Sequence, residues 1–193
     1  MLLDIGIGIF ASILVGKLFS LPLTPLLVGF GVACALIPDI DLWYTIARRG
    51  HRDIHAIIKH RNILHYPLVY IPVGTALTAL FGYQWSLLFF LASFGHFIHD
   101  SIGLGWGVAW LWPFTTRSYT FFYRYTAPEK RLPRQALYRW ERQDMDRLID
   151  TYRDANWLRN IYLKLHPVFA IEIAGFLFAV YLLWRIGAAY AGN

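Results

Sequence analysis

The sequence has few charged residues and almost no cysteine, and each shortage excludes a class of protein. Charged residues make up 16% of the 193 residues and hydrophobic ones 57%, which is unusual for a soluble domain and typical of a membrane protein. The single cysteine, Cys34, excludes an intrachain disulfide and a cysteine-based metal site. The chain has no internal repeat and no low-complexity tract. We therefore expect a single membrane domain over residues 1–193.

The hydrophobic residues gather in long runs, each close to the ~20 residues that cross a bilayer as a helix. The runs cover residues 2–20, 21–38, 63–82, 85–103 and 167–189. They predict an all-α, multi-pass membrane helical bundle with about five spans, arranged as two hairpins and a lone last helix. Either hairpin could instead be half-inserted.

Lysine and arginine are concentrated in two stretches between these runs. The loop after the second run holds five of them and the segment after the fourth holds eleven. The positive-inside rule places both stretches, and the N-terminus, in the cytoplasm. A net charge of +6 fits cytoplasmic loops near anionic lipid, and the chain lacks a stacked aromatic–basic pattern for RNA. We expect the lipid bilayer as a partner and no nucleic acid.

The long basic segment differs in kind from the apolar runs. Between residues 127 and 165, apolar side chains recur at helical spacing with charged ones between them. This pattern predicts an amphipathic helix that lies on the membrane or caps the bundle. The domain would then consist of a helical core (1–115), a cytoplasmic basic amphipathic segment (116–165) and a last span (166–193).

His96 and Asp100 stand out because they lie inside one of the most apolar stretches of the chain. Spaced by four, they share one face of a helix, and an imidazole and a carboxylate one turn apart can grip one divalent cation. A charged aspartate in an apolar span costs about 2.5–3.5 kcal/mol at mid-bilayer, so it needs a partner, a cavity or a metal. A His–Asp hydrogen bond that locks two helices together is the alternative.

Further carboxylates and imidazoles come to the same membrane face, where hydropathy requires none. The candidate metal ligands are Asp39, Asp41, His60, His65, His96 and Asp100. Nitrogen and oxygen ligands without sulfur suit zinc, manganese or iron in a hydrolytic role, and six exceed one tetrahedral ion, so one to three ions could bind. Helix capping and ordinary interfacial histidine would explain the same residues without a metal.

Arg61 lies between the two histidines at 60 and 65, where it could clamp a phosphate as a catalytic residue. It could equally anchor the chain at the cytoplasmic face. Five other polar residues remain open as members of the site. They are Asp4, His51, His55, His99 and Glu172.

The order of these motifs is similar to that of a known family. The motifs are Asp39-Ile40-Asp41 after a proline, His-Arg-x-x-x-His at 60–65, His-x-x-x-Asp at 96–100 and Gly-Val-Ala-Trp-Leu-Trp-Pro-Phe at 107–114. Over residues 1–115 they resemble the YdjM-type, LexA-regulated inner-membrane proteins described as metal-dependent hydrolases. Through a distant relation to zinc-dependent phospholipase C, the resemblance implies an all-helical fold, phosphoester chemistry and metal-binding roles for the six candidate ligands. The family has a histidine near the N-terminus where this chain has Asp4.

We therefore expect a membrane-embedded metal-dependent hydrolase of the inner membrane. Its cofactor would be a divalent metal, zinc or alternatively manganese, and its substrate a phosphoester or a lipid at the cytoplasmic face. A divalent-cation transporter or sensor could use the same ligands without hydrolysis. A structural membrane protein whose polar residues only pair with one another is the third hypothesis. The sequence leaves the oligomeric state open.

Overall fold

The structure is a computed structural model that describes residues 1–49 and 63–191. These residues form seven α-helices and one two-stranded sheet. By its internal contacts the chain divides into two units, and the division falls within one helix, between His96 and Phe97. The first unit comprises Met1–Pro38, Ile71–His96 and Pro167–Asn193, and the second comprises Asp39–Tyr70 and Phe97–His166.

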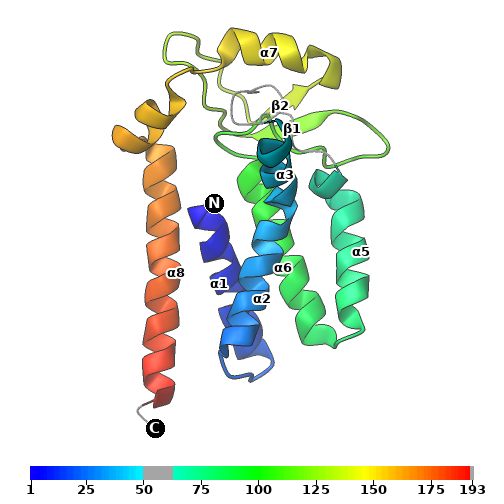
Figure 1. Cartoon of the computed structure of the whole chain (residues 1–193), viewed down its shortest axis with the longest axis vertical. Helices are drawn as coiled ribbons and strands as arrows, with labels where there is room; N and C mark the ends of the chain where they lie inside the picture. The colour runs from blue at the N-terminus through cyan, green and yellow to red at the C-terminus, as the bar shows by residue number, and fades with distance from the viewer. Residues whose placement is uncertain (50–62, 192–193) are drawn as a thin grey trace. The chain divides into compact units, whose positions relative to one another are not determined.

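Apolar helices build the first unit. They are α1 (Leu2–Leu18), α2 (Pro25–Leu36), α5 (Pro67–Ala79), α6 (Tyr83–Asp100) and α8 (Pro167–Ala191), of which α5 begins and α6 ends in the second unit. The start of α2 follows from its sequence, because the Thr24 side chain accepts a hydrogen bond from the Leu27 amide and Pro25 fits the first helical turn. Helix α1 lies beside both α2 and α8 (Figure 1).

Small residues allow α1 to approach α2 closely. A Cβ atom on Gly8 would lie 2.5 Å from the Cα of Val32 and 2.7 Å from the carbonyl oxygen of Gly31. The Ser12 hydroxyl contacts the carbonyl oxygen of Gly8 in its own helix and that of Leu27 across this interface. Such small and hydroxyl side chains are typical of helix pairs that pack in membranes.

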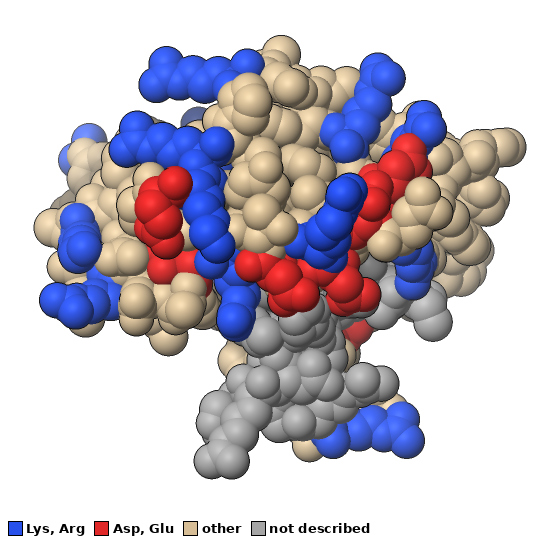
Figure 2. Space-filling model, turned by 90° about the horizontal axis from the view of Figure 1, so that it is seen from above, with Lys and Arg blue, Asp and Glu red and all other residues tan. Residues whose placement is uncertain are grey.

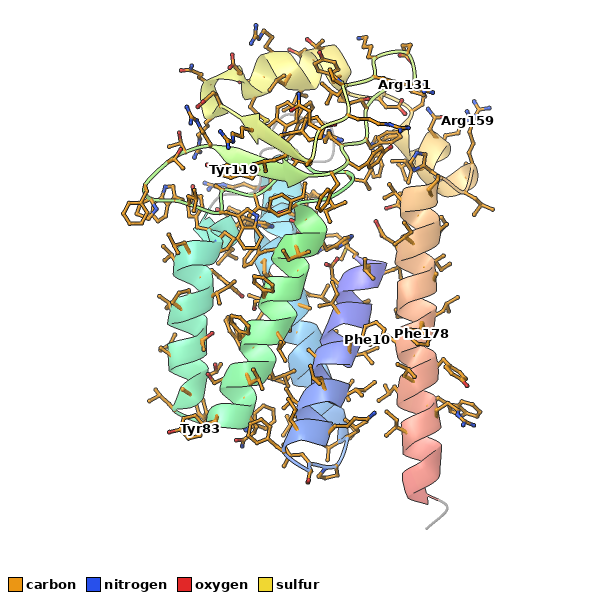
Figure 3. The ribbon with its side chains drawn as sticks, turned by 180° about the vertical axis from the view of Figure 1, so that it is seen from behind. Phe10, Tyr83, Tyr119, Arg131, Arg159 and Phe178 are labelled. Atoms are coloured by element: carbon orange, nitrogen blue, oxygen red, sulfur yellow. The ribbon has the colours of Figure 1, made fainter. Side chains whose placement is uncertain are left out.

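Helix α1 meets α8 through larger side chains. The rings of Phe10 and Phe178 point toward one another with their centroids 5.9 Å apart (Figure 3). Ile9, Ile13 and Ala179 form the buried core between these helices. The apolar sequence of α8 is thus buried on one side only, and large side chains such as Trp184 stay exposed.

The second unit combines short helices with a small sheet. Its regular elements are α3 (Ile40–Arg49), β1 (Ser118–Phe121), β2 (Leu137–Trp140) and α7 (Met145–Tyr152), with short helical turns at Ile63–His65, Arg142–Asp144 and Arg159–Leu163. A further turn, Ile37–Asp39, begins in the first unit and ends in the second. The strands pair antiparallel, with Ser118 opposite Trp140. Trp106, Tyr138, Trp140 and Ile149 form the core between the sheet and α7.

The expected number of spans is not supported. All five apolar runs contain helices, but within the described residues only two stretches, Pro25–Arg48 and Pro167–Gly187, are long and apolar enough to cross a membrane. The third run yields only the 13 residues of α5, about 20 Å of helix against a hydrocarbon core of about 30 Å. What stands is a mostly helical chain with two candidate membrane spans.

The prediction of an amphipathic helix over residues 127–165 was wrong, because this part of the chain contains strand β2 and only a short helix, α7, and the chain is therefore not purely α-helical. Leu137 and Trp140 are three apart, which suggested a helix, but the buried pair is Tyr138 and Trp140, spaced by two as in a strand. Only the 8 residues of α7 realise the expected amphipathic helix. Figure 2 shows lysines and arginines spread over one face of the molecule, some of them beside acidic groups. Within the segment, Arg147 forms an ion pair with Asp144.

Candidate metal centre

The aspartates and the histidine that could bind a metal in the second unit lie at or near the ends of helical elements. Asp39 ends the turn Ile37–Asp39, and Asp41 lies in the first turn of α3, where the helix dipole favours an acid. His65 ends the turn Ile63–His65, directly before α5. Asp100 is the last residue of α6. Each of these side chains therefore lies at or near the end of a helical element.

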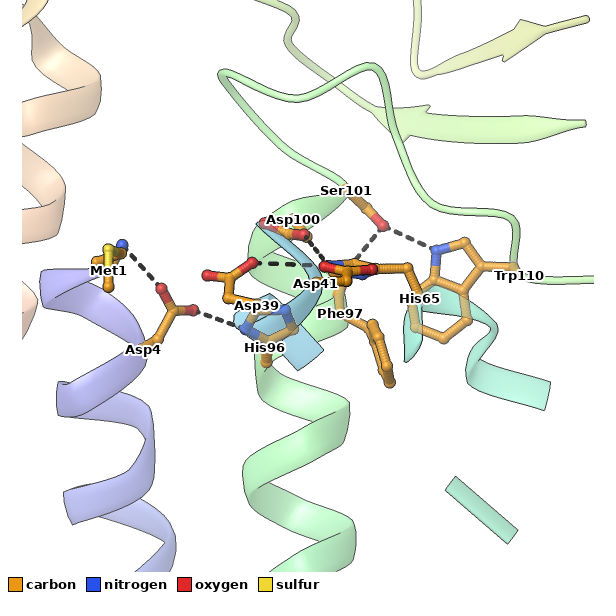
Figure 4. Close-up of polar contacts among 10 residues, drawn as sticks. All are labelled: Met1, Asp4, Asp39, Asp41, His65, His96, Phe97, Asp100, Ser101 and Trp110. Carbon is orange, nitrogen blue, oxygen red and sulfur yellow. Dashed lines mark hydrogen bonds and ion pairs between the residues drawn. The ribbon is translucent and has the colours of Figure 1, made fainter. Parts of the chain in front are cut away.

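His65 is the centre of this group. Its side chain is fully buried, and its Nε2 atom lies 3.2 Å from Asp100 Oδ2 and 3.6 Å from Asp39 Oδ1. On the other side of the ring, Nδ1 donates a hydrogen bond to Asp41 Oδ2 at 3.2 Å (Figure 4). Three carboxylates that are themselves largely buried thus surround one imidazole.

The three carboxylates around His65 need a compensating positive charge, because they are largely buried. Burial by itself would lower the pKa of His65, but the hydrogen bonds to Asp100, Asp39 and Asp41 raise the pKa to about 10. Buried carboxylates are tolerated only when a cation or hydrogen-bond donors compensate them. The compensating charge at this point is either the proton on His65 or a metal ion.

His96 lies one turn before Asp100 on α6 and is fully buried. Within the first unit its Nδ1 atom lies 3.2 Å from Asp4 Oδ1, and Asp4 Oδ2 lies 2.8 Å from the N-terminal amine (Figure 4). Glu172 of α8 lies 4.0 Å from the same amine. The sequence did not decide whether Asp4 belongs to the site. Asp4 is, like Asp100, an acidic residue in an apolar run, and this feature could have singled it out.

Four side chains meet the geometric requirement for a shared ion. Asp39, His65, His96 and Asp100 each offer one ligand atom, and these atoms all lie within 4.8 Å of one another. Ligands of one tetrahedral ion with bonds of ~2.1 Å are roughly 3.4 Å apart, close to the separations of Nε2 of His65 from Asp100 and Asp39. Two nitrogen and two oxygen ligands suit zinc or manganese, so the residues fit a divalent cation.

The remaining sequence-predicted residues have different positions. Asp41 contacts the ring nitrogen of His65 opposite to Asp39 and Asp100, and it is not in the group of four. His60 and Arg61, as well as His51 and His55, lie outside the described residues. His99 is half-buried on α6 and is likewise not one of the four.

Comparison with known proteins identifies the family. No curated protein and no solved structure matches the chain. A family model described as YdjM inner membrane protein matches residues 4–186, which include Asp4, all four grouped side chains and most of α8. This match extends well beyond the motif-bearing part of the sequence, residues 1–115. The chain therefore belongs to the YdjM inner membrane protein family.

Proposed function

We propose that the chain is a membrane-embedded, metal-dependent hydrolase that acts on a phosphoester or lipid-like substrate at the cytoplasmic face of the inner membrane. The observation that supports it most is the buried group of two histidines and two aspartates. Membership of an inner membrane protein family and two helices long enough to span support association with the bilayer. Four ligands suit a single ion, zinc or alternatively manganese.

We also propose a multi-pass topology with the N-terminus in the cytoplasm. All five apolar runs contain helices, and the lysines and arginines of segment 116–165 give it the charge of a cytoplasmic loop. Helices too short to span, such as α5, would be half-inserted and packed against longer ones. The candidate ligands would then lie near the cytoplasmic surface, within reach of a lipid headgroup.

The reaction follows from what the side chains can do. A bound divalent cation supplies Lewis acidity, which activates water near neutral pH and polarises a phosphoryl oxygen. His65, His96, Asp39 and Asp100 would hold that ion. The second carboxylate oxygen of Asp39 or Asp100 would take the proton of the attacking water as general base. Arg61 remains the proposed group for binding the phosphate.

A divalent-cation transporter or sensor is the alternative use of the same ligands. Ionisable groups inside apolar helices mark ion pathways as well as catalytic sites, and Asp4, His96 and Glu172 are such groups in the first unit. A transporter would hold the ion without hydrolysing a phosphoester and would move it across the bilayer. The two functions therefore differ in two separate measurements on the same protein.

Metal content and phosphodiester hydrolysis test the proposal. Full-length protein purified in detergent is compared with His65→Ala and with Asp150→Asn, a control at an exposed aspartate of α7. Elemental analysis should give about one equivalent of zinc or manganese in the wild type and in the control, and much less in His65→Ala. Hydrolysis of bis-para-nitrophenyl phosphate and of phospholipid vesicles should follow the metal content.

The outcomes separate the hypotheses. Bound metal together with hydrolysis that the His65→Ala variant loses supports the hydrolase. Bound metal with no hydrolysis, but with cation uptake into protein-containing vesicles, refutes the hydrolase and supports the transporter. Wild-type protein that stays metal-free after incubation with zinc refutes both, and leaves the His–Asp contacts as structural bonds.

A further inference from the structure

The two histidines of the candidate site each have an aspartate on the same ring nitrogen. His65 Nδ1 donates to Asp41 Oδ2 at 3.2 Å in the second unit. His96 Nδ1 lies 3.2 Å from Asp4 Oδ1 in the first unit (Figure 4). The same local arrangement thus occurs twice, with residues from different elements: α3 and the turn before α5 in one case, and α1 and α6 in the other.

The opposite nitrogen of His65 faces the other two aspartates. Its Nε2 atom lies 3.2 Å from Asp100 and 3.6 Å from Asp39, separations typical of ligands that share one ion. A neutral imidazole binds a metal through one nitrogen, and the hydrogen bond made by the other nitrogen decides which one that is. Since Asp41 occupies Nδ1, the lone pair for the metal lies on Nε2, and Asp41 lies on the far side of the ring.

We propose that Asp41 and Asp4 are positioning residues for the metal site and not ligands of it, an inference that rests on the proposed function. Each carboxylate holds its imidazole with the proton on Nδ1, so that Nε2 points at the ion. Carboxylate–histidine–metal arrangements of this kind fix ring orientation and increase ligand basicity. The site then takes one divalent cation with four ligands, not a cluster of two or three ions.

The composition of the site agrees with a single ion. Within residues 1–49 and 63–191, the four grouped side chains are the one set of three or more potential ligands that lie together. Asp4 is almost completely buried, with 1% of its surface exposed, and a carboxylate in such a place needs a donor. The N-terminal amine meets that need at Oδ2 and the His96 ring at Oδ1, and the His65 ring contacts Asp41 in the same way.

Cobalt binding to full-length protein tests the proposal, because the visible absorption of Co²⁺ reports its coordination. Removing an outer partner of a metal-binding histidine typically costs 10–100-fold in metal affinity. Asp41→Ala and Asp4→Ala should each weaken cobalt binding by about that factor, while one equivalent still binds with the wild-type absorption spectrum. Asp41→Asn and Asp4→Asn keep an oxygen acceptor for Nδ1–H and should recover most of the affinity.

Two further variants provide the comparison. Asp39→Ala removes a proposed ligand and should change the cobalt spectrum itself, whereas Asp150→Ala on the exposed face of α7 should change neither spectrum nor affinity. The asparagine variants keep the shape of the side chain, so they decide the matter if an alanine variant does not fold. An Asp41→Asn spectrum that matches Asp39→Ala instead of the wild type would show that Asp41 is a ligand.

The possible failures are distinguishable. Wild-type protein that binds no cobalt would refute the metal site, and with it the proposed function. Wild-type protein that binds cobalt, and loses a second equivalent or its four-coordinate spectrum when Asp41 or Asp4 is changed, would overturn this inference and leave the proposed function standing.

Discussion

Two glycines of α2 that are only two residues apart should respond to the same substitution with opposite signs. Gly31 faces α1, and a Cβ atom there would lie 2.6 Å from the carbonyl oxygen of Gly8, 3.1 Å from the Leu88 side chain and closer still to the Ser12 hydroxyl. At Gly29 nothing lies within 4 Å of a Cβ atom. Gly31→Ala therefore tests the α1–α2 contact, and Gly29→Ala is its matched control.

The magnitude follows from these contacts. The Gly8 carbonyl is backbone and cannot move away without separating the helices, so overpacking at Gly31 should cost about 1–3 kcal/mol. The Ser12 hydroxyl would be displaced from the carbonyls of Gly8 and Leu27, 2.8 and 3.2 Å away, which should cost about 1 kcal/mol more. Gly29→Ala only restricts the unfolded chain and should stabilise the helix by roughly 0.5–1 kcal/mol.

Thermal unfolding of the detergent-solubilised full chain, followed by circular dichroism, measures the difference. At about 2–4 °C per kcal/mol for a chain of this size, Gly31→Ala should lower the Tm by roughly 5–15 °C. Gly29→Ala should raise the Tm by about 1–4 °C. Equal Tm values for Gly31→Ala and the wild type would refute the close approach of α1 and α2.

Three further predictions concern the second unit. In metal-free protein the three aspartates raise the pKa of His65 to about 10, so a metal ion must displace a proton from this side chain. Metal affinity should therefore rise about tenfold per pH unit between about pH 6 and 9. Calorimetry of metal binding in two buffers measures the protons released, and a release of none would contradict this. Burial would raise the pKa of Asp154, but hydrogen bonds from Tyr125 and Asn160 hold it below its usual value. Asp154 therefore stabilises the fold above about pH 4 and loses that contribution as the pH falls, so acid titration should show Asp154→Asn unfolding with a shallower pH dependence than the wild type. Ile149→Ala, at a fully buried position, should cost about 2–4 kcal/mol and lower the denaturant midpoint; an unchanged midpoint would refute the core.

The sequence predicts the helices well because long apolar runs leave the backbone no other way to satisfy its hydrogen bonds in a membrane. It predicts their lengths poorly. The third apolar run begins with the short turn Ile63–His65, whose His65 contacts the aspartates, and not with a long helix. Helix α5 begins only at Pro67 and is therefore shorter than the run. The sheet was missed because Leu137 and Trp140 are three apart, as in a helix, whereas the side chains that β2 buries are Tyr138 and Trp140, which are two apart. Such short strands are decided by their partner strand, which local sequence does not reveal.

Part of the candidate site was predictable, because a charged side chain in an apolar stretch needs a partner, a cavity or a metal ion to compensate its charge. That argument singled out His96 and Asp100, and the structure brings both together with Asp39 and His65. It could not indicate which ring nitrogen an aspartate contacts, because that depends on how helices from distant parts of the chain pack. For the same reason the contact of Asp4 with His96 became visible only in three dimensions.

The charges of the four grouped side chains also favour a particular kind of ion. Asp39 and Asp100 contribute two negative charges, and His65 and His96 would bind as neutral imidazoles, so a divalent cation gives a centre without net charge. A monovalent or a trivalent cation would leave one uncompensated charge among side chains that are largely buried, and burial penalises such a charge strongly. Of the two remaining aspartates, Asp4 contacts the N-terminal amine as well as His96, and Asp41 accepts a hydrogen bond from the Nδ1–H group of His65.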